Sequence, residues 1–202
     1  MSLANPPSTV VEVDLRARRA PTPVISAPAR RRSLVAVERL LLAVALGLVV
    51  VGVVLRFVTH SSLWLDEALT VNIARLPLPQ LFAALRQDGS PPLYYLVLHF
   101  WMALFGGGDT SVRVLPALIS VATLPVAWIL GRTVGGRNAA VAALVLLATS
   151  PFAIRYATEG RMYSLVMLLS MVATLALIRC LRSPTPAWLV MLGVSGGLLL
   201  LT

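Results

Sequence analysis

The apolar stretch at residues 40–58 reads LLLAVALGLVVVGVVLRFV and decides the class of fold. As a helix rising 1.5 Å per residue it reaches about 28 Å, close to the ~30 Å hydrocarbon core of a bilayer. The whole chain of 202 residues is 58% hydrophobic, with a mean hydropathy of +0.86. These values exclude a soluble domain and indicate an integral membrane protein.

Further apolar runs follow the first one. Four of them are interpreted as additional spans, at residues 112–130, 139–154, 162–178 and 187–202. The sequence therefore predicts an all-α, polytopic transmembrane protein with about five spans. The last run reaches the end of the sequence without a charged flank, so we expect the chain to be the front part of a longer protein.

Shorter helices are predicted between the first two spans. The apolar run at residues 93–105 reaches only about 20 Å as a helix, so it is predicted to be interfacial or re-entrant. Two short amphipathic stretches, 63–75 and 78–86, are bounded by prolines. They predict helices that lie on the membrane surface.

The N-terminal region is polar and basic. All 17 basic residues of the chain are arginines, and the net charge is +9. An Arg-rich segment that leads into a span is typical of the cytoplasmic side and of contact with anionic lipid, so we expect no nucleic-acid partner. Residues 1–33 predict a disordered cytoplasmic tail that precedes a transmembrane domain at 34–202. The first apolar run is too long for a cleavable signal peptide, so the tail should stay attached.

Two pairs of arginines fix the predicted topology. They follow the spans at 112–130 and 162–178, and are Arg132 with Arg137 and Arg179 with Arg182. Because arginines favour the cytoplasmic side, both pairs are expected there. This placement agrees with the number of spans only if residues 93–105 do not cross the membrane. The first outer loop, residues 59–111, and the turn YATEGRMY at 156–163 then lie outside the cytoplasm.

Acidic residues gather on this predicted outer side. They are Asp66, Glu67, Asp88, Asp109 and Glu159. Ionisable groups near a bilayer are costly, and they are kept where they pair, line a cavity or react. Asp66 and Glu67 stand beside Trp64 and Leu65, which suggests burial at the interface, although a solvated loop or a helix N-terminus is the ordinary alternative.

Other candidate residues follow in the outer segments. Glu159 and Arg161 are close enough to pair, and Tyr163 adds a hydroxyl; an ordinary loop with an exposed ion pair is the alternative. Arg113 stands on the outer side, against the charge rule, and needs an anionic partner, either a phosphate or a carboxylate. Cys180 is the only cysteine, which excludes an internal disulfide and a Cys-based metal site.

The stretch DGSPPLYYLVLHFW at residues 88–101 carries further polar and aromatic side chains. Tyr94, Tyr95 and His99 are counted among the candidate substrate-binding residues. Aromatic residues at a bilayer boundary are usually anchors, and a single His is more often a hydrogen-bonded structural residue. Both explanations stay open for these three positions.

Five segments resemble a known family. They are LWLDEALT, SPPLYYLVLHFWMALFG, VRVLPALIS, GRTVGGRNAAVAALVLLATSPF and RYATEGRMYSL, in this order and spacing. The chain is similar to the N-terminal half of the GT-C membrane glycosyltransferases, in particular the protein O-mannosyltransferase and aminoarabinose transferase group of family 39. The resemblance covers roughly residues 40–182. It implies a partial GT-C fold with interfacial helices in the first extracytoplasmic loop.

The resemblance also implies roles. The donor would be a sugar linked to a polyprenyl phosphate, and the acceptor a hydroxyl outside the cytoplasm, attacked with inversion. Asp66 corresponds to the catalytic base, Glu67 would support it, and Glu159 corresponds to an acid of the second outer loop near donor or acceptor. Arg113 and Arg161 would contact the lipid phosphate. Several relatives carry a Lys where this chain has Ser90, and this difference weakens the transfer of their phosphate-binding mode.

Several properties stay open at this level. The sequence does not name the sugar or the acceptor, which is a protein, a lipid or a glycan, and Mg²⁺ or Mn²⁺ is a possible cofactor. The expected location is the cell membrane, with the N-terminus in the cytoplasm. A proton- or cation-coupled transporter or lipid flippase is the first alternative, although carriers usually hold their acids near the bilayer midplane. A non-catalytic membrane scaffold is the second.

Overall fold

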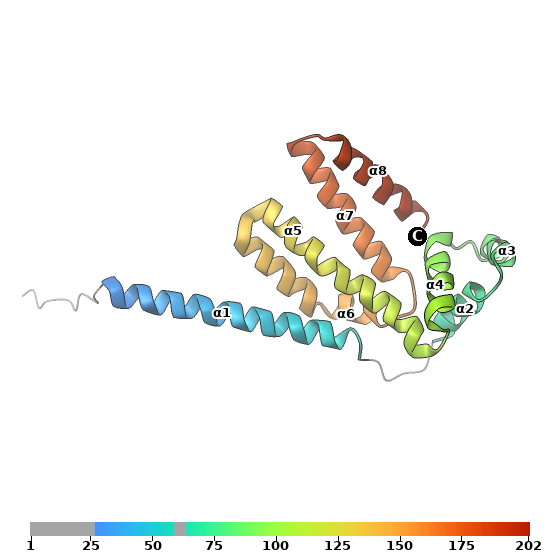
Figure 1. Ribbon diagram of the computed structural model, residues 1–202, viewed down its shortest axis with the longest axis horizontal. Coiled ribbons are helices and arrows are strands. Elements are labelled where there is room, and N and C mark those ends of the chain that lie inside the picture. The colour runs from blue at the N-terminus through green and yellow to red at the C-terminus, as the bar shows by residue number, and fades with distance from the viewer. Residues whose placement is uncertain (1–26, 59–63) are drawn as a thin grey trace, which may run out of the picture. The chain divides into compact units, whose positions relative to one another are not determined.

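The computed structural model describes residues 27–58 and 64–202 of the chain, with side chains from residue 35 onward. The described residues form eight α-helices and contain no strand (Figure 1). The predicted all-α fold is therefore confirmed. The chain divides into two compact units, residues 1–41 and 42–202, with the boundary inside the first helix.

The first helix, α1, spans Ala27–Leu55, and its part Val35–Leu55 is long and apolar enough to cross a membrane. It begins earlier than the apolar run at 40–58 and takes in residues 27–33, which had been assigned to the disordered tail. Alanine, arginine and leucine are good helix formers, and they lead into the apolar run without a break. The prediction of disorder for residues 1–26 lies outside the described residues.

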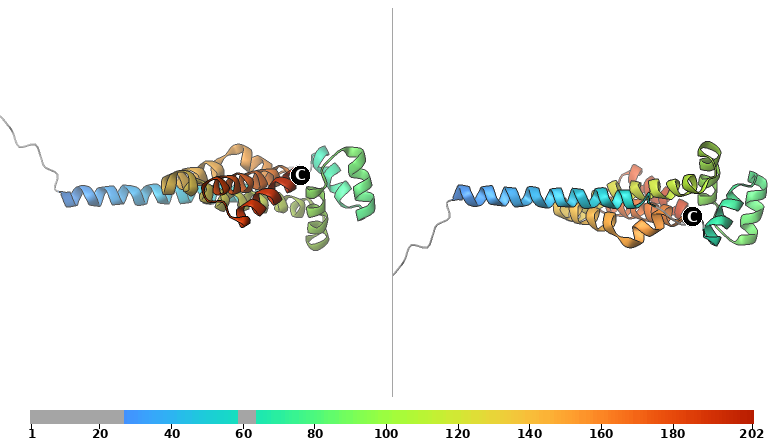
Figure 2. Two further views of the ribbon diagram at one scale, coloured as in Figure 1. Left: turned by 90° about the horizontal axis from the view of Figure 1, so that it is seen from above. Right: turned by 90° about the horizontal axis from the view of Figure 1, so that it is seen from below.

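Three short helices follow the first span. They are α2 (Leu65–Ala74), α3 (Leu78–Asp88) and α4 (Pro92–Phe105). Their bounds agree with the short helices predicted between the first two spans. Buried side chains of α2, α3 and α4, among them Val71, Leu81 and Leu98, form a core with Val112 of the next helix. Around this core α4 packs against α2 and the beginning of α5, and α3 packs against α2. Figure 2 shows the ribbon from two further sides.

The longest helix, α5, spans Asp109–Thr149 but consists of two arms. Gly135 and Gly136 have non-helical backbone angles, and Gly136 has a φ of 74°, a conformation that favours glycine. The chain turns back at this point in Figure 1. The turn falls between the predicted spans at 112–130 and 139–154. We call residues 109–134 the first arm of α5 and residues 137–149 the second arm.

The remaining helices are α6 (Pro151–Ala157), α7 (Tyr163–Arg182) and α8 (Pro186–Leu200). The predicted span at 139–154 is broken at Ser150, because the residue before a proline is driven out of the helical conformation and Pro151 starts a new helix. α7 packs against both α5 and α8. The backbone N–H of Leu93 donates to the carbonyl of Leu201 at 2.8 Å, which connects the end of α8 to the start of α4.

Within the described residues, three helices are long and apolar enough to cross a membrane: Val35–Leu55, Asp109–Thr149 and Tyr163–Arg182. α4 and α8 are apolar but shorter. Large apolar side chains such as Leu46, Leu146 and Leu181 are exposed on these helices, as expected for surfaces that face lipid. The first arm of α5 begins at the same end of the helix bundle as α7. At that end, Arg113 and the N–H of Gly160, which precedes α7, both bond to Glu67.

Candidate active site

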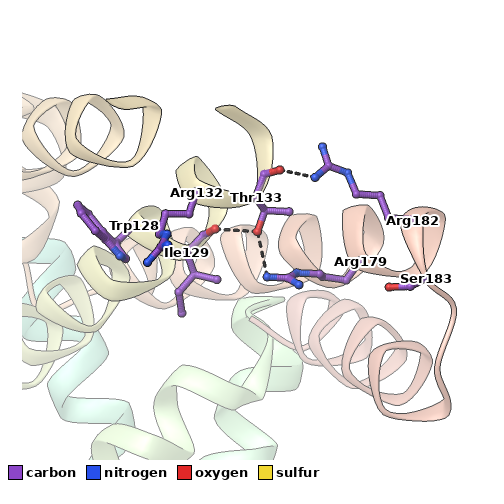
Figure 3. Close-up of a pocket in the computed structure, with 7 residues that line it drawn as sticks. All are labelled: Trp128, Ile129, Arg132, Thr133, Arg179, Arg182 and Ser183. Carbon is purple, nitrogen blue, oxygen red and sulfur yellow. Dashed lines mark hydrogen bonds between the residues drawn. The ribbon is translucent and has the colours of Figure 1, made fainter. Parts of the chain in front are cut away.

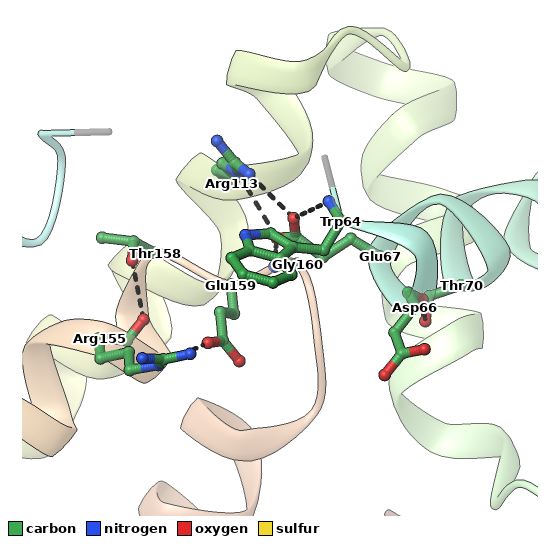
Figure 4. Close-up of polar contacts among 9 residues, drawn as sticks. All are labelled: Trp64, Asp66, Glu67, Thr70, Arg113, Arg155, Thr158, Glu159 and Gly160. Atoms are coloured by element: carbon green, nitrogen blue, oxygen red, sulfur yellow. Dashed lines mark hydrogen bonds and ion pairs between the residues drawn. The ribbon is translucent and has the colours of Figure 1, made fainter. Parts of the chain in front are cut away.

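The acid pair lies in the first turn of α2. Trp64 has an extended backbone and precedes the helix, and its N–H donates to Oε2 of Glu67 at 2.9 Å (Figure 4). A glutamate at the third helical position that reaches back to the residue before the helix is half of a capping box, and it satisfies an N–H that the helix leaves free. The sequence WLDE therefore starts this helix and places both carboxylates at its N-terminus.

Glu67 is buried and fully bonded. Its side chain is 2% exposed and pairs with Arg113, whose Nη2 lies 2.8 Å from Oε2 and whose Nε lies 3.4 Å from Oε1. The N–H of Gly160 donates to Oε1 at 2.6 Å. Burial raises the pKa of Glu67, but the hydrogen bonds from Arg113, Gly160 and Trp64 outweigh burial and leave the pKa below its ordinary value. One carboxylate thus joins α2, α5 and the segment before α7.

Asp66 has the opposite environment. Its side chain is 71% exposed, and its Oδ2 accepts a hydrogen bond from Nη1 of Arg161 at 2.5 Å. The Nε of Arg161 is buried without a hydrogen-bond partner, and its guanidinium lies over the ring of Tyr163, 5.7 Å from the centroid. No described residue bonds to the second carboxylate oxygen of Asp66. That oxygen is accessible to a substrate.

Glu159 lies in the same region, in an ion pair with Arg155 of α6, whose Nε is 3.1 Å from Oε1 of Glu159. Figure 4 shows this pair together with Trp64 and Asp66. A pocket of about 170 Å³ joins these groups, and its lining residues are Trp64, Asp66, Glu67, Arg155, Glu159, Arg161 and Tyr163. Residues nearly 100 positions apart in the sequence thus form one acidic and basic site.

The structure places four predicted site residues outside this pocket lining. Arg113 is 6% exposed and forms an ion pair with the carboxylate of Glu67. Tyr94 and Tyr95 are buried in the core of the short helices, and Nδ1 of His99 is 2.8 Å from the carbonyl of Ala74. His99 therefore connects α4 to the end of α2.

Tyr94 has one property that the sequence did not reveal. Its hydroxyl is buried and has no hydrogen-bond partner among the described residues. Burial, and then the negative charge of Glu67, raise the pKa of Tyr94 above its ordinary range. The phenol therefore stays neutral behind the acid pair.

Two lining or bonding residues were missed by sequence reasoning. Arg155 stands four residues before Glu159, and this helical spacing is a signal that could have identified the pair. Gly160 acts through its backbone N–H, which every residue except proline possesses, so no sequence signal marks it.

A divalent cation in this pocket stays a prediction. Among the described residues, no group of three or more His, Cys, Asp or Glu side chains is close enough to hold a metal ion. Asp66, Glu67 and Glu159 each pair with a different arginine, which supplies the positive charge that a cation would bring.

Comparison with known proteins identifies the family. A family model described as dolichyl-phosphate-mannose-protein mannosyltransferase matches residues 89–202, which include Arg113, Glu159 and Arg161 but not Asp66 and Glu67. No curated protein and no solved structure matches the chain. Since the match covers more than half of the sequence, the chain belongs to the dolichyl-phosphate-mannose-protein mannosyltransferase family, whose members are glycosyltransferases of the membrane.

Proposed function

We propose that the chain transfers a sugar from a polyprenyl-phosphate donor to an acceptor hydroxyl outside the cytoplasm, with inversion at the anomeric carbon. The family supports a mannosyltransferase type of reaction and a lipid-linked donor. The identity of the acceptor, the inversion and the side of the membrane belong to the proposal. The active site would be the pocket between the start of α2 and the segment before α7.

The observation that carries the proposal is the difference between the two adjacent acids. Glu67 is buried and accepts hydrogen bonds from Arg113, Gly160 and Trp64, so its oxygens are occupied. Asp66 is exposed, and only one of its oxygens is bonded, by Arg161. A general base must reach the proton that it removes, so Asp66 is the base and Glu67 is a positioning residue.

The reaction needs one proton transfer and one displacement. The acceptor oxygen attacks the anomeric carbon from the face opposite the phosphate, and the bond between that carbon and the phosphate oxygen breaks. The acceptor proton passes to the free oxygen of Asp66. The electron pair of the broken bond leaves with the polyprenyl phosphate, on which negative charge develops.

Arg161 and Arg155 are the residues that we assign to the leaving phosphate. Both line the pocket, and Arg155 is largely exposed. Fixed positive charge near a leaving phosphate stabilises the transition state more than the ground state. Arg113 is not assigned this role, because Glu67 already holds it in the interior. Glu159 orients Arg155, and Tyr163 supports Arg161 through its ring.

The transporter alternative has less support from the arrangement of the acids. Asp66 and Glu67 lie at the beginning of a ten-residue helix, and Glu159 lies between α6 and α7. Carriers place coupling acids on interrupted helices near the bilayer midplane. The acids of this site lie at a helix N-terminus and in a connecting segment instead.

Replacing Asp66 by Asn tests the proposal in the full protein that carries this sequence. The substrate would be radiolabelled mannosyl-phosphoryl polyprenol in native membranes, and the measured quantity is the release of polyprenyl phosphate together with transfer of label. Loss of a positioned general base lowers the rate about 10²- to 10⁴-fold. Because Asp66 is exposed, folding should be unchanged.

Asp109→Asn is the matched control. Asp109 is an exposed acid in the first turn of α5 that does not line the pocket, so this variant should keep its transfer rate. Full transfer by the Asp66→Asn protein would rule out Asp66 as the base. Equal losses in both variants would mean that general surface charge, not the pocket, controls the rate.

A further inference from the structure

A second pocket lies at the end of the helix bundle away from the acid pair. Its volume is about 590 Å³, and it is lined by Trp128, Ile129, Arg132, Thr133, Arg179, Arg182 and Ser183. Figure 3 shows Arg179 and Arg182 of α7 reaching toward Thr133 on the first arm of α5. The three guanidinium groups come from two helices that are far apart in the sequence.

Most N–H donors of these arginines have no protein acceptor. Nη2 of Arg179 donates to Oγ1 of Thr133 at 3.2 Å, and Nη1 of Arg182 donates to the carbonyl of Thr133. The Nε of Arg179 is buried without a partner, and Arg132 forms no hydrogen bond or ion pair with any described residue. Each guanidinium carries five N–H donors, so the pocket offers far more donors than the protein satisfies.

The pocket also lacks a counter-charge from the protein. None of its seven lining residues is acidic. Arg113 and Arg132 are 19 residues apart on the first arm, which corresponds to about 28 Å along a helix. This length is close to the thickness of a bilayer core, so the acid pocket and the arginine pocket lie about one membrane thickness apart.

The geometry points to a binding site for a phosphate group in this second pocket. Guanidinium groups match the oxygen atoms of phosphate with paired hydrogen bonds, and the positive charge of three of them exceeds the negative charge of a phosphate monoester or of two diesters. Trp128 in the lining and Trp188, whose ring is 5.5 Å from the guanidinium carbon of Arg179, are aromatic residues of the kind found at headgroup level. The phosphate comes either from an anionic lipid headgroup or from a soluble phosphate ester.

The inference goes beyond sugar transfer, because the pocket shares no residue with the acid site. It also goes beyond the general preference of arginine for one side of a membrane. That preference needs only charge, whereas here three guanidinium groups line one pocket and the Nε of Arg179 is buried without a hydrogen-bond partner. Lysine keeps the charge but not the planar set of donors.

Native mass spectrometry of the detergent-purified full protein tests the inference with defined lipids. We expect phosphatidylglycerol to be retained in preference to phosphatidylcholine. The variants Arg132→Gln and Arg179→Gln should each retain it about fivefold more weakly, the effect of about 1 kcal/mol per basic residue. Arg179→Lys should recover only part of the loss. Because Arg132 has no protein partner, its variant should fold normally.

A second arm titrates glycerol 3-phosphate, which carries the same phosphate without acyl chains. Displacement of the bound lipid by millimolar glycerol phosphate identifies a soluble ester as the ligand, and resistance to displacement identifies a lipid headgroup. Both results support a phosphate site. Arg86→Gln, an exposed arginine of α3, is the control. Equal lipid loss in this control, or no preference for phosphatidylglycerol over phosphatidylcholine, would overturn the inference.

Discussion

At the scale of single residues, the adjacent acids Asp66 and Glu67 differ in burial and in hydrogen bonding. Successive residues of an α-helix point about 100° apart, so a buried Glu67 directs Asp66 away from the core. The buried carboxylate receives donors from three segments, and the exposed one receives a single arginine. The ion pair of Glu67 with Arg113 joins two helices in the interior, and under the proposed function the proton transfer belongs to Asp66.

Glu67→Gln should destabilise the protein strongly. It leaves Arg113 charged and buried without its anion, and loss of one partner of a buried ion pair costs about 3–5 kcal/mol. For a chain of this length we expect the melting temperature to fall by about 6–20 °C, measured by thermal unfolding in detergent. Glu159→Gln is the control, because its partner Arg155 is exposed and such pairs contribute less than about 1 kcal/mol.

The pH dependence of unfolding tests whether the carboxylate of Glu67 stabilises the fold through its charge. The pKa of Glu67 is lower in the folded protein than the ordinary value of about 4.3. At a pH between the folded and the unfolded pKa of Glu67, the unfolded chain binds more protons than the folded protein. The stability that Glu67 contributes is therefore complete above about pH 4.3 and is lost as the pH falls through the folded pKa. Glutamine does not titrate, so the variant should lack this loss. If the melting temperatures of the parent protein and the variant fall equally with decreasing pH, the role given to Glu67 is contradicted.

At the scale of elements, a buried arginine joins α1 to α5. Arg56 is 1% exposed. Its Nη1 donates to the carbonyl of Gly52 at 2.6 Å and to the carbonyl of Ala148 at 2.8 Å. Its Nε donates to the hydroxyl of Ser120 at 3.0 Å. Nη2 donates to Leu147 at 2.8 Å. The carbonyls of residues 147 and 148 end the second arm of α5, where a helix leaves acceptors unsatisfied and a cation is favourable.

Gly52→Ala should weaken this contact, because a Cβ at residue 52 would lie 2.2 Å from the carbonyl oxygen of Ala148. Backbone atoms cannot move aside as a flexible side chain can, so α1 must shift and strain the bonds of Arg56. Overpacking of this kind costs about 1–3 kcal/mol, visible as a lower melting temperature.

Gly47→Ala is the matched control in the same helix. A Cβ at residue 47 would meet nothing within 4 Å, and alanine favours helix over glycine. This variant should be as stable as the parent protein or slightly more stable. Equal destabilisation by both substitutions would show that the close approach of α1 to Ala148 does not form.

At the scale of the whole molecule, the charged sites lie at opposite ends of two parallel segments. The first arm of α5 runs from Arg113 to Arg132, and α7 runs from Tyr163 to Arg182. Both start at the acid pocket and end at the arginine pocket. The turn at residues 135–136 belongs to the arginine end. The pocket of paired acids and arginines is thus separated from the pocket lined by arginines alone by a membrane-sized length of apolar helix.

Labelling of single cysteines tests which ends face which compartment. In a Cys180→Ser background, Gln87→Cys near the acid end should react with an impermeant maleimide in intact cells. Asn138→Cys, just after the turn of α5, should react only after permeabilisation. Both residues are exposed, so accessibility to water is comparable. Reaction of both positions in intact cells would contradict the topology predicted from the arginines.

The sequence by itself determined the helical class, the short helices before the second span, the break between residues 130 and 139, and the candidates Asp66, Glu67, Glu159 and Arg161. Apolar run lengths, prolines and glycines act locally, so a linear reading is enough to find them. Only the tertiary structure decided that Glu67 is buried with Arg113, that His99 binds the carbonyl of Ala74, and that Arg132 joins Arg179 in one pocket. These facts depend on contacts between residues tens of positions apart, and on backbone groups that every residue type shares, so no local pattern encodes them.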